Sequence, residues 1–200
     1  AVHLTGLVVG AVAVPVLVMR AAGWHGASGA LAAAAIYGAS LIAMLGLSAA
    51  YNMVHRPGLK AVLRRFDHGA IYVKIAGTYT PFAVLAGGSA KIMVLATIWS
   101  AAVAGLVLVI ATPRGHYWMA LALYLAMGWA ALVIGGPMLA AMSTTGVLLI
   151  VIGGLLYTVG VIFHLWDRLP YQNAIWHAHV LVASMVFYAA VVLEMGLGAG

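Results

Sequence analysis

Residues 91–111 read KIMVLATIWSAAVAGLVLVIA, and after Lys91 this stretch contains no charged side chain. A helix needs roughly 20 apolar residues to cross the hydrocarbon core of a bilayer, so this stretch predicts a membrane-spanning helix. The whole chain has the same character, because 66% of its 200 residues are hydrophobic and only 6% are charged. A soluble domain is typically about half apolar and about a quarter charged. The composition therefore excludes an ordinary soluble protein.

Clusters of polar residues, glycine and proline divide the chain into seven such apolar stretches. We therefore predict an all-α fold, a seven-helix transmembrane bundle that forms a single domain over residues 1–200. The gaps are short, so consecutive helices should run antiparallel to each other. Pro15 and Pro81 are expected to kink or end their helices. The predicted spans cover residues 3–22, 28–54, 68–86, 91–111, 116–138, 144–165 and 172–197.

The positions of the basic residues predict which way the bundle faces. Lys and Arg concentrate in the cytoplasmic loops of membrane proteins. The gaps after the second, fourth and sixth predicted spans hold six of these residues, whereas the opposite gaps hold only Arg20 and Lys91. This predicts a multi-pass protein of the cell (inner) membrane with a cytoplasmic N-terminus and an external C-terminus. Because the net charge of +6 is a topology signal, the expected partners are membrane lipids and no nucleic acid.

Polar side chains gather at the predicted cytoplasmic ends of the spans. Ser48 and Asn52 are four residues apart on the second span, as are Asn173 and His177 on the seventh, so each pair shares one helix face. Asp67 adds a carboxylate at the start of the third span. Ionisable groups at membrane depth are costly, by about 2.5 to 3.5 kcal/mol on insertion scales, so they tend to face the bundle interior and mark function.

Two interpretations of this convergence stay open from spacing alone. Side chains from three facing helices can build a metal site in a bundle core. Alternatively, the same residues form a hydrogen-bonded cluster that joins helices, at about 0.6 kcal/mol per bond. Other residues near span ends are interpreted as interfacial. These are His3, His68 and His116 at the cytoplasmic face and Glu194 at the outer face.

Four longer motifs carry a family resemblance, and they extend over most of the chain. They are SAAYN (48–52), FDHGAIY (66–72), IAGTYTPF (75–82) and AIWH (174–177). These motifs resemble the hemolysin III branch of the progestin and adipoQ receptor superfamily. The resemblance implies seven helices with a cytoplasmic N-terminus, in agreement with the distribution of charge.

The resemblance also implies a site and an activity. It implies a zinc ion near the cytoplasmic ends of helices 2, 3 and 7, held by three histidines, with a serine and an aspartate close to a metal-bound water. The implied reaction is hydrolysis of a lipid amide, as in ceramidases, where zinc lowers the pKa of that water and polarises the scissile carbonyl. Mapped by motif, Ser48 and Asp67 are the catalytic residues and His177 is one metal ligand.

The other two ligand positions depart from the family pattern, which has His where this chain has Asn52 and Asn173. An amide oxygen is a harder and weaker donor for zinc than an imidazole nitrogen. We therefore expect a metal site of His177, Asn52 and Asn173 to bind zinc poorly. The shape of asparagine still permits hydrogen bonds between the helices.

Lys74 is a second departure, because the family pattern has an apolar residue there. It follows Asp67 by seven residues and so lies on the same helix face, about 10.5 Å away along the axis. One hypothesis is that the Lys74 ammonium acts as a surrogate cation that pairs with Asp67. The alternative is a lysine that extends toward the cytoplasmic headgroups.

Three functions follow from these observations. The first is a hemolysin III-like membrane protein whose polar site is weakened in metal binding or catalytically silent, which the two asparagines favour. The second is an active zinc-dependent membrane amidohydrolase acting on a ceramide-type lipid. The third is the cytolytic or pore-forming activity that the family name implies, although no helix carries the regular polar stripe that a water-filled pore needs.

Overall fold

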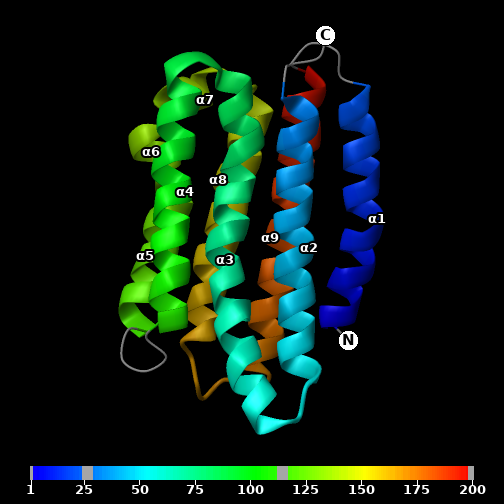
Figure 1. The fold of residues 1–200 in the computed structure, drawn as a ribbon, viewed down its shortest axis with the longest axis vertical. Helices are drawn as coiled ribbons and strands as arrows, with labels where there is room; N and C mark the ends of the chain where they lie inside the picture. Colours follow the sequence, from blue (N-terminus) through cyan, green and yellow to red (C-terminus); the bar gives the residue numbers. More distant parts are fainter. Residues whose placement is uncertain (1, 24–28, 112–116, 198–200) are drawn as a thin grey trace.

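The computed structural model describes residues 2–23, 29–111 and 117–197, which form α-helices and connecting turns with no strand (Figure 1). The long helices run along a common axis, and α1 begins at the end of the bundle opposite to the one where α9 ends. The helices are α1 (Val2–Ala22), α2 (Ala30–Met53), α3 (Pro57–Ala86), α4 (Gly88–Ala111), α5 (Tyr117–Trp129), α6 (Ala131–Ile134), α7 (Gly136–Ala140), α8 (Thr144–His164) and α9 (Gln172–Leu197).

Five of the described helices are long and apolar enough to cross a membrane, namely α1, α2, α4, α8 and α9, and α5 is a shorter apolar helix. Their outward faces carry large hydrophobic side chains such as Val8, Val107 and Leu148, which are more than half exposed. In water such faces would be unfavourable, but lipid tails solvate them well. The predicted all-α membrane architecture is therefore confirmed.

Helix α3 begins eleven residues before the predicted third span, at Pro57 instead of residue 68. Proline suits the first turn of a helix, where its missing N–H would have had no partner. The following turns contain no further proline and expose Lys60 and Arg64. The stretch interpreted as a polar gap is thus an extension of the helix. Neither Pro15 nor Pro81 ends its helix, since α1 and α3 both continue past them.

The predicted fifth span, residues 116–138, is broken into α5, α6 and α7. A break inside a bundle leaves backbone groups without helical partners, and lipid supplies none. Tyr79 on α3 compensates, because its hydroxyl donates to the Met127 carbonyl at 3.0 Å and accepts from the Ala131 N–H at 2.8 Å. The tyrosine of the IAGTYTPF motif therefore stabilises the irregular backbone between α5 and α6.

Glycines allow α3 to pack closely against its neighbours. A Cβ at Gly77 would lie 2.2 Å from Ser40 Oγ on α2, and one at Gly105 of α4 would lie 2.4 Å from the ring of Tyr72. Tyr72 is fully buried and its hydroxyl donates to the Ala120 carbonyl on α5. The contact at Gly105 thus positions a ring that links α3, α4 and α5.

Helices α8 and α9 pack through three glycines spaced seven residues apart on α8. Gly146 lies against Glu194, Gly153 against Phe187, and Gly160 against Trp176 and His179. Because α9 runs antiparallel to α8, its large side chains meet these glycines in reverse order along the chain. The pairing extends over the whole length of both helices.

The prediction that Glu194 faces the outer interface is wrong. Its side chain is only 3% exposed, and its carboxylate accepts hydrogen bonds from the backbone N–H and the hydroxyl of Ser143. Ser143 in turn caps α8 by accepting from the Gly146 N–H at 3.0 Å. A carboxylate near a helix N-terminus is favourable, so this charge is buried because the start of α8 binds it.

Replacement of Gly105 by alanine should destabilise the protein by about 1 to 3 kcal/mol, because overpacking displaces buried groups and the Tyr72 ring has no free space to enter. The measurement is the free energy of unfolding in mixed detergent micelles. Gly46→Ala is the matched control, since a Cβ there meets nothing within 4 Å, and it should be neutral or mildly stabilising. Equal effects of the two substitutions would contradict the packing described here.

Candidate functional site

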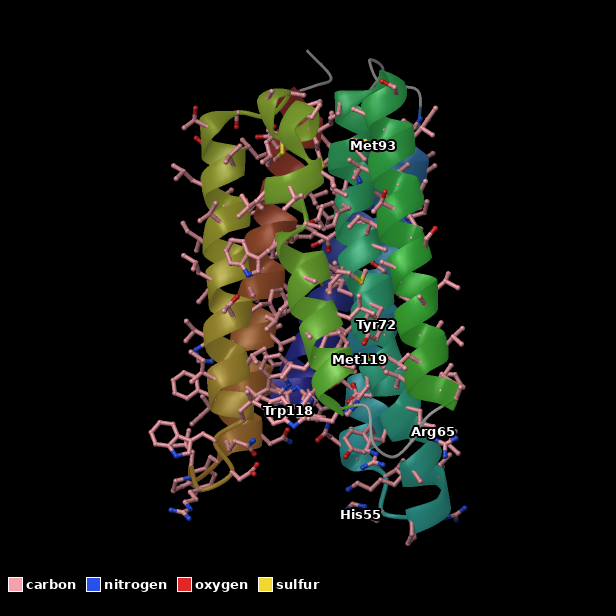
Figure 2. All side chains as sticks on the ribbon, turned by 90° about the vertical axis from the view of Figure 1, so that its left-hand side faces the viewer. His55, Arg65, Tyr72, Met93, Trp118 and Met119 are labelled. Carbon is pink, nitrogen blue, oxygen red and sulfur yellow. The ribbon has the colours of Figure 1, made fainter. Side chains whose placement is uncertain are left out.

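A cavity of about 440 Å³ occupies the interior of the bundle. Residues from each of the described helices α1 to α9 line it. Its polar lining includes Arg65. Figure 2 shows Arg65 near the lower end of the bundle, the end where His55 also lies, whereas Met93 lies near the upper end. A volume of this size lies within the range of about 300 to 1,000 Å³ typical of small-molecule sites.

The structure brings most of the predicted site residues to this one cavity. Ser48, Asp67, Lys74, Asn173 and His177 all line it. Asn52 does not, because its side chain turns back along α2 and across to α9. His116 lies outside the described residues.

Ser48 and Asp67 are neighbours across the contact between α2 and α3. The Ser48 side chain is buried, and its hydroxyl lies near the Asp67 carboxyl without forming a well-made hydrogen bond. The Nδ1 atom of His164, also on the cavity wall, is likewise buried with no hydrogen-bond partner. Buried polar atoms normally have partners, so these two atoms mark the part of the wall that suits a polar ligand group.

The two asparagines bind each other. Asn173 Nδ2 donates to Asn52 Oδ1 at 3.2 Å, and Asn52 Nδ2 donates to the Ser48 carbonyl at 2.9 Å. The amide pair therefore connects α9 to α2, and it uses the oxygen that Asn52 would offer to a cation. Of the two interpretations left open by the sequence, these contacts match the hydrogen-bonded cluster.

Four histidines line the cavity, and two of them, His3 and His68, are residues whose position near a span end predicts an interfacial place. The rings of His3 on α1 and His177 on α9 lie edge to face with centroids 4.3 Å apart, and both line the wall. His68 and His164 line it as well. The sequence shows that these histidines share a position near one end of the helices. It does not show which way each side chain points, because that depends on the rotation of each helix about its axis, and hydrophobic periodicity defines this rotation poorly in so apolar a chain.

Lys74 does not extend toward the headgroups, so that alternative is wrong. The side chain is 3% exposed, and its ammonium donates to Thr78 Oγ1 at 2.6 Å, one turn further from Asp67. It also lies 4.4 Å from the centroid of the Tyr37 ring. No direct ion pair joins Lys74 to Asp67, although both side chains are described, and the ammonium donates to Thr78 instead.

The described residues do not fit a zinc ion. A catalytic zinc site usually has three protein ligands that are nitrogen, sulfur or carboxylate oxygen. Among the described parts of the chain, no group of three His, Cys, Asp or Glu side chains is arranged to hold a metal. His177 offers one imidazole beside His3, while the amides of Asn52 and Asn173 bind each other.

Sequence comparison agrees with the architecture. The sequence model of a family described as "Haemolysin-III related" matches residues 1–188. The chain is 34% identical over 190 residues to "Hemolysin-3" of Bacillus cereus, which covers 94% of this chain and 86% of that protein. The chain belongs to the haemolysin III family.

Two further relatives show how far the similarity extends. The "Hemolysin-3 homolog" of Bacillus subtilis is 34% identical over 192 residues, covering 94% of this chain and 89% of its own length. The human "Monocyte to macrophage differentiation factor" is 29% identical over 163 residues, covering 78% of this chain and 67% of its own length. This haemolysin III protein is therefore a multi-pass protein of the cell (inner) membrane.

The Asn52–Asn173 bond should appear as an energetic coupling between α2 and α9. In a double-mutant cycle of Asn52→Ala and Asn173→Ala, we expect a coupling of about 0.6 kcal/mol in the free energy of unfolding, a typical value for such bonds in membranes. Asn173→Ala combined with Ser89→Ala, which lies at the start of α4 and at the opposite end of the bundle, should give no coupling. A zero coupling in the asparagine cycle would mean that the bond adds nothing to stability.

Proposed function

We propose that this haemolysin III protein binds a membrane lipid in its central cavity and does not act as an efficient zinc hydrolase. The observation that carries the proposal is the hydrogen bond between Asn52 and Asn173, at the two positions where the family resemblance implies zinc ligands. Amides are weak zinc donors, and here they already bind each other.

The cavity supports the lipid-binding part of the proposal. Its wall combines the polar end around Ser48, Asp67 and His177 with a remainder in which large apolar side chains predominate, as expected for a ligand with a polar head and a hydrocarbon chain. The unpartnered Ser48 Oγ and His164 Nδ1 are available to a polar head group. The partner class is therefore a membrane lipid.

The runner-up is an active zinc-dependent hydrolase of ceramide-type lipids. One observation favours it, namely that Ser48, Asp67 and His177 line the same cavity, as the family site requires. The ligand set argues against it, so we assign no catalytic step to these residues. Metal analysis separates the two functions.

Purified protein should contain far less than stoichiometric zinc. The double variant Asn52→His and Asn173→His should raise the zinc content toward stoichiometric, because it adds two imidazoles beside His177. The measurement is elemental analysis after dialysis against zinc. Asn52→Gln with Asn173→Gln is the matched control, which changes the same positions without adding an imidazole and should remain zinc-poor.

Two results would count against this assignment. Stoichiometric zinc in the unmodified protein, together with release of fatty acid from ceramide, would support the hydrolase. A histidine double variant that binds no zinc would show that the motif mapping of these two positions is incorrect.

We also propose seven membrane crossings with a cytoplasmic N-terminus. Helix α3 would form the third crossing, and α5, α6 and α7 together the fifth. An odd number of crossings is supported by α1 beginning and α9 ending at opposite ends of the bundle (Figure 1).

The absence of cysteine makes this topology testable by single-cysteine labelling. Gly58→Cys, near the start of α3, should react with a membrane-impermeant maleimide only after the cells are permeabilised. Ser89→Cys, near the start of α4, should react in intact cells once any outer envelope is removed. The reverse pattern would invert the topology, and equal labelling of both positions in intact cells would contradict the crossing of α3.

A further inference from the structure

Lys74 is a buried lysine without an anionic partner. The chain has only three acidic residues, and all three are described. Asp67 lies two turns away without an ion pair, Asp167 is exposed in the turn after α8, and Glu194 accepts from Ser143 at the start of that helix. The nearest partners of the ammonium are instead the hydroxyl of Thr78 and the ring of Tyr37.

These two partners stabilise the ammonium only in part. A hydroxyl dipole and an aromatic ring face attract a cation, but neither neutralises it. Ionisable side chains inside a membrane usually pair with an opposite charge or face a ligand pathway. Lys74 faces the cavity, so the place where its missing partner can enter is already present.

The rest of the cavity wall favours an anion. Arg64 and Arg65 line its polar end, and the Arg64 side chain is also exposed on the protein surface. Together with Lys74 these residues place three cations on a wall whose single carboxylate is Asp67. A cleft lined mainly by one sign of charge between low-dielectric walls concentrates ligands of the opposite sign.

The rest of the cavity wall is largely apolar, although the hydroxyls of Thr78, Tyr157 and Thr158 also belong to it. Its large apolar side chains include members of α3, α7, α8 and α9, and they suit a hydrocarbon chain better than a polar metabolite. Among them are Ile75, Phe82, Met138, Ile150 and Phe187.

We infer that Lys74 is the head-group contact of a site for a single-chain lipid anion, a carboxylate or a phosphate monoester on one hydrocarbon chain. The anionic head binds the Lys74 ammonium, Arg64 and Arg65 attract it to the cavity, and the chain lies along the apolar wall. This inference rests on the proposed lipid-binding function and names the class of its ligand. No bond is made or broken in the binding.

The test is equilibrium binding to the full-length protein in nanodiscs of phosphatidylcholine. The probes are palmitate, palmitoyl lysophosphatidate and hexadecanol, which share a chain length and differ in the head group. Palmitate or the lysophosphatidate should bind at least about tenfold more tightly than hexadecanol, a difference of about 1.4 kcal/mol, because hydrogen bonds between charged groups are stronger than those to a neutral hydroxyl. Whichever anion binds more tightly identifies the head group.

Lys74→Met should abolish the preference for the anions while leaving hexadecanol binding unchanged, and Lys74→Arg should retain it. Methionine has a similar length and no charge, so the variant is expected to fold, and its thermal unfolding is measured alongside. Lys91→Met, a basic-to-apolar change away from the cavity, is the matched control and should bind like the unmodified protein.

The possible outcomes separate the two proposals. If Lys74→Met binds palmitate and lysophosphatidate as tightly as the unmodified protein does, the inference about Lys74 is wrong, although the lipid site remains. If none of the three probes binds saturably to the unmodified protein, the cavity is not a lipid site and both proposals fail. If hexadecanol binds as tightly as the anions, the ligand is a neutral lipid.

Discussion

Lipid offers no hydrogen-bond partners, so each polar group inside this bundle has to find one within the protein. The structure satisfies this requirement with contacts that also join helices. Tyr79 binds the backbone at the break between α5 and α6, Glu194 binds the start of α8, and Asn52 binds Asn173 between α2 and α9. In a chain that is 66% hydrophobic, these few contacts help to define which helices are neighbours, together with the close packing at glycines. Apolar faces alone are interchangeable in a bilayer, because lipid tails solvate them all equally well.

The candidate site is the part of the interior where this requirement is met least completely. Ser48 Oγ and His164 Nδ1 are buried without partners, and Lys74 has a hydroxyl and a ring beside it but no anion. All three belong to the wall of one cavity. Elsewhere the chain pairs even a buried glutamate. Among the described residues one further buried atom has no hydrogen-bond partner, the hydroxyl oxygen of Tyr37, and it belongs to the ring that lies beside Lys74. This incomplete pairing is the main structural reason to regard the cavity as a ligand site.

Much of the fold follows from the sequence, because apolar length and helix-breaking residues are local properties. The predicted ends of most spans lie within a few residues of the observed helix ends. The convergence of Ser48, Asp67 and His177 on one cavity also follows, since position along a helix indicates depth. The direction in which a side chain points does not follow, because a helix that is apolar on all sides has no distinct inner face. Glu194 and His3 show this limit, because their position near span ends predicts an interfacial place and yet both contact the interior.

The seven-residue spacing of Gly146, Gly153 and Gly160 fixes the register of α8 against α9 over about 21 Å of helix. Each residue added to or removed from a helix turns everything beyond it by about 100°. A single insertion within residues 147–159 would therefore move Gly160 away from Trp176 and rotate His164 away from the cavity. This segment can vary on its lipid-facing side but not in length. The number of residues between these glycines thus sets part of the geometry of the polar site. Some of the glycines lie two turns or more away from that site along α8.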